Sequence, residues 1–101
     1  MKTFLISYSL KEGTETQRRQ EMEAFIAALQ ADPTLKGRIG YRCMKAKDGA
    51  AYYHLATTFD EGANAELQSK DFFKRYSEQT KRCAGGTVTV TPLEIVAETM
   101  P

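Results

Sequence analysis

Residues 38–59, with the sequence RIGYRCMKAKDGAAYYHLATTF, predict the β-hairpin that decides the fold. Two extended runs, 38–47 and 50–59, are rich in aromatic and β-branched residues, and Asp48-Gly49 lies between them. Asp-Gly between two such runs is typical of a type I′ turn, in which both central residues have positive φ. We therefore expect Asp48 and Gly49 to be the central residues of a tight turn.

This turn determines which residues of the two strands face each other. Cys43 is expected opposite His54, and Arg42 opposite Leu55. One face of the hairpin then carries Gly40, Arg42, Met44, Tyr53, Leu55, Thr57 and Phe59, and the other carries Ile39, Tyr41, Cys43, Tyr52, His54, Ala56 and Thr58. Both faces are partly apolar, so we expect both to be covered.

The chain before the hairpin predicts a strand and a helix. Residues 3–10 show the period-two pattern of a strand. Thr14 and Gln17 form a capping box that begins a helix, and Pro33 ends it. The helix has an apolar stripe made of Met22, Phe25, Ile26 and Leu29. Its other side, which we expect to face water, carries Arg18, Arg19, Gln20, Glu21 and Glu23.

The chain after the hairpin predicts a second helix and a last strand. Asp60 is a candidate N-cap, the helix has a possible break near Ser69, and Gly85 follows its end as a C-cap. The last strand covers about residues 87–96, and Pro92 within it predicts a sheet edge or a bulge.

The order of elements is therefore β-α-β-β-α-β, which predicts one α+β domain of the ferredoxin-like kind over residues 1–101. Such a domain has a four-stranded antiparallel sheet with two helices on one face. We expect the sheet face with Tyr41, Tyr52 and Ala56 to be the one left open. A second copy of the chain would cover it, which predicts a homodimer.

Composition and charge argue against several other classes of protein. Lys and Arg total 14 against 13 for Asp and Glu, and this balance argues against binding to nucleic acid. No apolar run is long enough for a membrane span or a signal peptide, so we expect a cytoplasmic protein that binds no membrane. Two cysteines and one histidine give no disulfide framework and no metal site.

Three segments resemble the antibiotic biosynthesis monooxygenase-like proteins of the dimeric α+β barrel superfamily. These are residues 35–42 (LKGRIGYR), 53–61 (YHLATTFDE) and 67–72 (LQSKDF). In the family they correspond to a strand with glycine and tyrosine four residues apart, a strand that ends in an aromatic and an acidic residue, and a helix with leucine, serine and phenylalanine.

The resemblance implies a homodimer whose two sheets form a barrel, with a small pocket between each sheet and its helices. Members of the family oxidise polyketide aromatics without a metal or an organic cofactor, or degrade haem. This chain departs from the family pattern at Phe59, where tryptophan is frequent, and at Glu66, where histidine is frequent. Haem degradation needs a histidine ligand on that helix, so we do not expect it and expect no cofactor.

His54 and Arg42 are the candidate catalytic residues. Histidine has an ordinary pKa near neutrality, so His54 would serve as the base that deprotonates a phenol, or would activate Cys43. Arg42 would stabilise the resulting anion. The structural alternatives are a half-buried histidine at the dimer interface, and an ion pair of Arg42 with Glu66 or Asp60.

The candidate substrate-binding residues are Tyr41, Tyr53, Phe59, Glu66, Phe72 and Tyr76. The aromatic side chains among them would line a pocket for a flat molecule, or would pack in the core and the dimer interface. Two functions stay open. One is a cofactor-independent monooxygenase that binds a compact aromatic or quinol-like molecule, and the other is a non-catalytic dimeric binding or structural module of the same fold.

Overall fold

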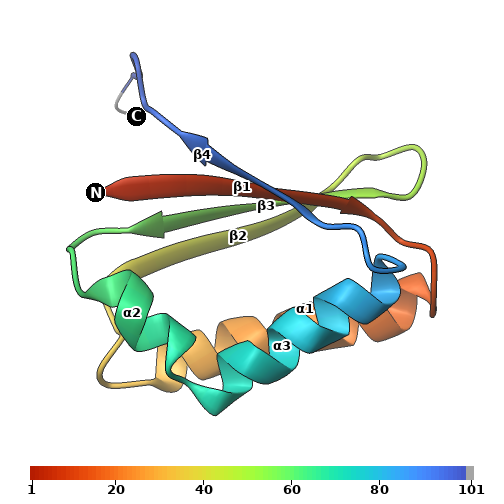
Figure 1. The fold of residues 1–101 in the computed structure, drawn as a ribbon, viewed down its shortest axis with the longest axis horizontal. Helices are drawn as coiled ribbons and strands as arrows, with labels where there is room; N and C mark the ends of the chain where they lie inside the picture. Colours follow the sequence, from red (N-terminus) through yellow and green to blue (C-terminus); the bar gives the residue numbers. More distant parts are fainter. Residues whose placement is uncertain (100–101) are drawn as a thin grey trace.

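The computed structural model describes residues 1–99 and contains a four-stranded antiparallel sheet with all helices on one face (Figure 1). Its elements are β1 (Lys2–Ser9), α1 (Glu15–Ala31), β2 (Ile39–Lys45), β3 (Ala51–Thr58), α2 (Ala63–Gln68), α3 (Asp71–Cys83) and β4 (Thr89–Leu93). The strands lie in the order β2-β3-β1-β4. This is the predicted ferredoxin-like α+β fold, with the second helix divided into α2 and α3 near the expected break.

The predicted register of the hairpin is confirmed, but the predicted turn type is wrong. Cys43 pairs with His54 as expected. Gly49 has a φ of 95°, whereas no residue other than glycine has positive φ within residues 1–99, so Asp48 cannot belong to a type I′ turn. The backbone N–H of Ala46 donates to the carbonyl of Ala51 at 2.9 Å and closes a wider loop. Such a loop needs only one left-handed residue, and glycine adopts that conformation without steric cost.

The helix ends follow the predicted signals at α1 and at the end of α3, but not at the start of α2. The Thr14 hydroxyl accepts a hydrogen bond from the Gln17 backbone N–H at 3.1 Å and caps α1. The Asp60 side chain lies before α2 and accepts from the Gly62 N–H at 3.0 Å, so Gly62, not Asp60, is the N-cap position. Gly85, at the end of α3, has a φ of 66°, as a glycine C-cap requires.

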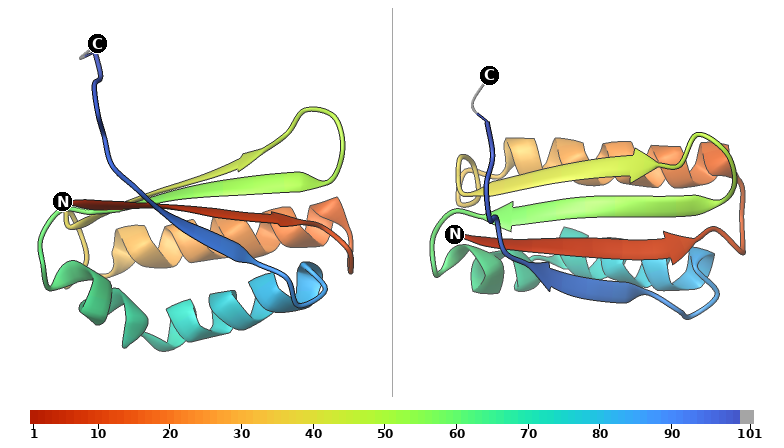
Figure 2. Two further views of the ribbon diagram at one scale, coloured as in Figure 1. Left: turned by 45° about the horizontal axis from the view of Figure 1, so that its top comes forward. Right: turned by 90° about the horizontal axis from the view of Figure 1, so that it is seen from above.

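The sheet faces are reversed relative to the prediction. Tyr52 and His54 lie on the face that the helices cover and are 2% and 0% exposed. Figure 2 shows that the helices leave the other face of the sheet open. This open face carries Arg42 and Tyr53. The prediction failed because both faces of the hairpin are partly apolar. The buried face carries tyrosine and histidine side chains that form hydrogen bonds with one another on the helix side of the sheet.

The strand that ends the described fold is shorter than predicted. β4 covers only five residues and lies at a sheet edge beside β1, which agrees with the position of Pro92. The chain after β4 leaves the sheet on the side away from the helices (Figure 1). Among residues 1–99, no helix has both the length and the apolar character that crossing a membrane requires.

Candidate functional site

A cavity of about 380 Å³ lies between the sheet and helices α2 and α3. Most of its wall is apolar. The lining residues are Phe4, Ile6, Ile39, Tyr41, Ala56, Thr58, Asn64, Leu67, Gln68, Phe73, Tyr76, Ser77, Thr80, Lys81, Val88 and Val90. Every strand of the sheet contributes to this wall, so the sheet forms one side of the cavity and the helices form the other. An apolar cavity with a few polar groups is the usual form of a site for a small organic molecule.

Arg18 is buried behind this cavity, which corrects the expectation that it faces water. The side chain is 1% exposed. Its Nε donates to the Tyr8 hydroxyl at 2.8 Å, and one terminal nitrogen donates to the Thr80 hydroxyl at 2.6 Å. The other terminal nitrogen pairs with Glu21 at 3.3 Å. Arg18 is thus buried because β1, α1 and α3 each supply a partner for its guanidinium group.

His54 is the centre of a cluster of tyrosine hydroxyl groups under the sheet. Its Nε2 lies 2.9 Å from the Tyr8 hydroxyl. Its Nδ1 lies 2.9 Å from the Tyr41 hydroxyl and 3.3 Å from the Tyr76 hydroxyl. Because Tyr41 and Tyr76 line the cavity, the cluster connects the buried Arg18 cation to the cavity wall through Tyr8 and His54.

The environment of the cluster keeps its titratable groups neutral. Burial, together with the nearby charge of Arg18, lowers the pKa of His54 to about 4. Burial also raises the pKa of Tyr8, Tyr41 and Tyr76 well above the ordinary value of a phenol. At neutral pH the cluster therefore consists of a neutral imidazole and three neutral phenols beside one cation. Such groups donate and accept hydrogen bonds but are weak bases.

The Arg18 cation also packs against two of these aromatic rings. Its Cζ atom lies 4.7 Å from the centroid of the Tyr76 ring and 5.3 Å from that of the Tyr8 ring. The Phe25 ring stacks on the Tyr76 ring with centroids 4.0 Å apart. Cation–π contacts of a desolvated guanidinium group are favourable. These contacts hold the phenol rings of the cluster in fixed positions.

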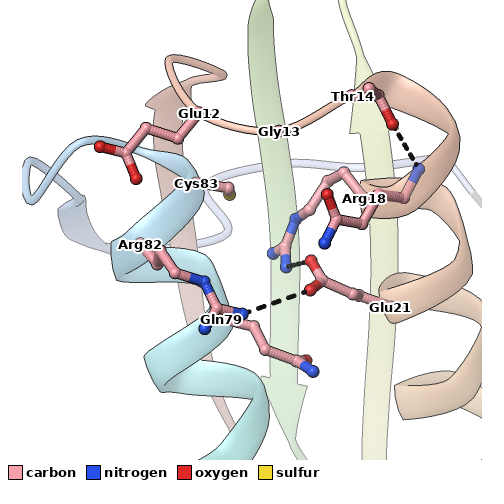
Figure 3. A pocket seen from close by; sticks show the side chains of 9 residues that line it. Glu12, Gly13, Thr14, Arg18, Glu21, Gln79, Arg82 and Cys83 are labelled. Atoms are coloured by element: carbon pink, nitrogen blue, oxygen red, sulfur yellow. Dashed lines mark hydrogen bonds and ion pairs between the residues drawn. The ribbon is translucent and has the colours of Figure 1, made fainter.

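A second, more polar cleft lies on the other side of Arg18, between the start of α1 and the end of α3 (Figure 3). Its volume is about 230 Å³. Glu21 lies in this cleft and contacts both Arg18 and Arg82, the latter at 3.8 Å. The buried thiol of Cys83 also lines it and donates to the carbonyl of Thr80 at 3.3 Å. Arg18 therefore separates a polar cleft from the apolar cavity.

The structure brings three of the predicted site residues together and keeps the others apart. His54, Tyr41 and Tyr76 form the cluster. Cys43, expected as a partner of His54, has its Sγ atom 3.9 Å from the Tyr76 hydroxyl instead. Phe72 packs against the core cluster and does not line the cavity.

The remaining candidates lie away from the cavity. Arg42 and Tyr53 lie on the open sheet face, and Phe59, just after β3, is 54% exposed. Glu66 lies on α2 but does not line the cavity. Arg42 forms an ion pair with neither of its expected partners. Asp60 is instead held by Arg38 through two hydrogen bonds of 2.8 Å.

The sequence did not identify Tyr8 as a member of the cluster, and it did not identify Arg18 and Thr80, which lie beside the cluster and are joined to each other by a hydrogen bond. Tyr8 was placed on a strand, but a hydrogen bond between residues 46 positions apart has no local signal. One signal for Arg18 was available. Arg18 lies four residues before Met22 and therefore shares its helix face with the apolar stripe.

Within residues 1–99, no three side chains of His, Cys, Asp or Glu lie close enough together to hold a metal ion. Several polar side chains line the cavity, and the cluster around His54 contributes two of them, the hydroxyls of Tyr41 and Tyr76. The others are the hydroxyls of Thr58, Ser77 and Thr80, the amides of Asn64 and Gln68, and the amine of Lys81. Thr80 already accepts from Arg18 and donates to the backbone carbonyl of Tyr76 at 2.8 Å. The tyrosine hydroxyls are thus the groups of this cluster best placed to meet a ligand.

Comparison with solved structures shows which proteins share this fold. SnoaB from Streptomyces nogalater, a cofactor-independent oxygenase, is 15% identical with a TM-score of 0.74, over 99% of this chain and 96% of SnoaB. Rv0793 from Mycobacterium tuberculosis is 16% identical with a TM-score of 0.77, over 98% of both chains. An antibiotic biosynthesis monooxygenase is 11% identical with a TM-score of 0.77, over 96% of this chain and all of the other.

At these identities the likeness shows a common fold. The sequence matches no protein-family model, and a comparison with curated proteins finds no match. The resemblance that the sequence suggested is therefore confirmed at the level of the fold, over nearly the whole chain.

Proposed function

We propose that this protein binds a compact aromatic or quinol-like molecule in the cavity between sheet and helices and oxidises it with molecular oxygen, without a cofactor. The observation that carries this proposal is the composition of the cavity. Its wall is mostly apolar and includes Tyr41 and Tyr76, whose hydroxyls lie within hydrogen-bond distance of His54. Arg18 is joined to His54 through Tyr8. The volume of about 380 Å³ suits a molecule of two or three fused rings. The fold shared with a cofactor-independent oxygenase supports the type of reaction.

The proposed reaction needs an electron-rich anion of the substrate. A phenol or enol bound beside the tyrosine hydroxyls loses its proton more readily when hydrogen bonds stabilise the resulting oxyanion. The phenol proton passes to water, and the anion itself reduces oxygen. The ring C–H group para to the oxyanion becomes a carbonyl, so that one oxygen atom of O₂ enters the quinone product, and the other leaves as water with the ring hydrogen and one proton. His54 has the role of a positioning residue in this scheme, because a base with a pKa of about 4 is weak.

A second candidate function is a non-catalytic binding or structural module of the same fold. One observation favours it: within the described residues, every buried side-chain nitrogen or oxygen atom has a hydrogen-bond partner. A cluster that is already satisfied does not need a ligand to complete it. A structural module predicts no ligand, whereas a binding module predicts the same ligand as the monooxygenase without consumption of oxygen.

We also propose that a second copy of the chain covers the open sheet face. Several large apolar side chains on or next to this face are more than one-third exposed: Met44, Tyr53, Phe59, Leu93, Ile95 and Val96. Exposed apolar surface of this kind is typical of an interface. We expect sedimentation velocity to show a dimer for the wild type and a monomer for Leu55→Lys, and a wild-type monomer at all concentrations would contradict the proposal.

The test of the proposed function is a thermal-shift screen against small phenols, quinols and aromatic carboxylates, followed by oxygen-electrode measurements on every hit. A ligand that binds the folded state raises Tm. Ala56→Phe fills the cavity, because Ala56 lines it, whereas Ala50→Phe makes the same change in the hairpin loop. We expect hits in the wild type and in Ala50→Phe but not in Ala56→Phe.

Oxygen uptake equal to the amount of product would support the monooxygenase. Binding without uptake would support the binding module, and equal binding by wild type and Ala56→Phe would contradict both. Thermal unfolding without ligand shows that each variant is folded before the comparison is made.

A further inference from the structure

The cluster around His54 is a chain of hydrogen bonds in which the direction of each bond depends on its neighbour. The guanidinium group of Arg18 contains no acceptor atom, so in the contact of 2.8 Å its Nε–H is the donor and the Tyr8 oxygen is the acceptor. Neutral imidazole carries one N–H, on either Nδ1 or Nε2. The Tyr8 hydroxyl lies at Nε2 and the Tyr41 hydroxyl lies at Nδ1, both at 2.9 Å. The Tyr76 hydroxyl is a second, more distant group at Nδ1, at 3.3 Å. With the nearer Tyr41 hydroxyl as the partner of Nδ1, two arrangements of the protons follow.

In the first arrangement the Tyr8 O–H donates to Nε2 and the Nδ1–H of His54 donates to Tyr41. The Tyr41 hydroxyl proton is then not donated to His54. In the second arrangement the Nε2–H donates to Tyr8 and Tyr41 donates to Nδ1. The Tyr8 hydroxyl proton is then left without an acceptor, although Tyr8 is only 6% exposed. A buried donor without an acceptor costs about 1–3 kcal/mol.

Two physical arguments select the first arrangement. Tyr41 lines the cavity, so its hydroxyl proton can reach water or a ligand, whereas Tyr8 is buried between Arg18 and His54. The first arrangement also points every O–H and N–H dipole away from the Arg18 cation, whereas the second points the Nε2–H toward it. Hydrogen bonds aligned in one direction strengthen one another.

We propose that His54 is held as its Nδ1–H tautomer and that Tyr41 is the ligand-contacting residue of the cavity, donating its hydroxyl proton to a carbonyl or oxyanion oxygen of the ligand. The proposal rests on the proposed function, because it names the part of the ligand that the cavity recognises. It selects ligands with an acceptor oxygen over hydrocarbons of the same shape. Arg18, Tyr8 and His54 act as positioning residues for Tyr41.

The tautomer is tested without any ligand. The chain has one histidine, so long-range ¹H–¹⁵N spectra at pH 7 contain one pair of imidazole nitrogens. We expect the protonated, pyrrole-type signal for Nδ1 and the unprotonated, pyridine-type signal for Nε2. The opposite assignment would overturn the proposal, because Nδ1 would then be an acceptor whose nearest donor is the Tyr41 hydroxyl, at 2.9 Å against 3.3 Å for Tyr76.

The contact with the ligand is tested by calorimetric titration with 1-tetralone and tetralin, which differ only by the carbonyl oxygen. We expect Tyr41→Phe to weaken 1-tetralone binding about fivefold, the ratio that corresponds to a net hydrogen bond of about 1 kcal/mol. Binding of tetralin should change less than twofold. Tyr52→Phe is the matched control, because Tyr52 is a buried tyrosine on the same face that does not line the cavity.

An equal loss for 1-tetralone and tetralin would overturn the proposal, as would an equal effect of Tyr52→Phe. If the wild type binds neither compound, the proposed function fails for this class of ligand. The NMR assignment still decides the direction of the hydrogen bonds between Tyr8, His54 and Tyr41. The failure of one proposal is therefore distinguishable from the failure of the other.

Discussion

Acidification between pH 7 and pH 4 is expected to destabilise this protein through His54. The side chain is 0% exposed, and the groups around it are the hydroxyls of Tyr8, Tyr41 and Tyr76 and the Arg18 cation. Among residues 1–99, the hydrogen-bond partners of the imidazole are tyrosine hydroxyls and include no carboxylate. Burial and the charge of Arg18 therefore lower its pKa from the ordinary value of 6.5 to about 4.

The sign and size of the effect follow from linkage. Below pH 6.5 the unfolded state takes up a proton that the folded state does not bind until about pH 4, so the free energy of unfolding falls as the pH falls across this window. The gap between the two pKa values is about 2.5 pH units, and 1.36 kcal/mol per unit corresponds to about 3 kcal/mol. This is a large part of the stability of a small domain.

The assay is urea unfolding at pH 7, 6, 5 and 4, followed by far-UV circular dichroism. Arg38 lowers the pKa of Asp60 to about 2, so the contribution of Asp60 to the free energy of unfolding is lost mainly below pH 4. Between pH 7 and pH 4 the change in stability therefore reports on His54. His54→Gln is the control, and it should be less stable at pH 7 but nearly independent of pH between 6.5 and 4. A flat wild-type profile, or the same slope in His54→Gln, would refute the reasoning.

Three further changes test the packing around the site by urea unfolding at pH 7. Arg18→Met should lower the free energy of unfolding by about 2–4 kcal/mol, because three hydrogen bonds are lost, two of them to buried hydroxyls. The exposed Arg19→Met should change it by less than about 0.5 kcal/mol. Thr80→Val removes the acceptor of an Arg18 N–H and should cost about 1–3 kcal/mol, and no loss would contradict the described bond. Gly49→Ala should cost about 1 kcal/mol, because φ at this position is 95°, whereas Ala50→Gly, next to it, should cost less.

The strands and their register were predictable from the sequence because the signals that specify them are local. A turn of fixed position and a period of two together determine that Cys43 pairs with His54. The same pattern cannot say which face the helices cover, because Leu55 and Tyr41 on opposite faces are both apolar. The face was decided by hydrogen bonds that join Tyr8 on β1 to α1 and His54 on β3 to α3, which have no local signal.

The candidate site was predictable only in part for the same reason. His54, Tyr41 and Tyr76 attracted notice through their residue types. Arg18 did not, because an arginine among polar residues on a helix normally faces water. Its burial depends on Tyr8 and Thr80, which lie 10 and 62 positions away in the chain.

The cavity is the central claim, and methyl chemical-shift mapping with 1-naphthol tests it most directly. The ¹³C-labelled methyl groups of Leu67, Val88 and Val90 report on the cavity, and those of Leu5 and Leu55 report on the open sheet face. We expect saturable shifts of the first group in the wild type and their loss in Ala56→Phe. Shifts confined to Leu5 and Leu55, or none at all, would contradict a ligand site between the sheet and the helices.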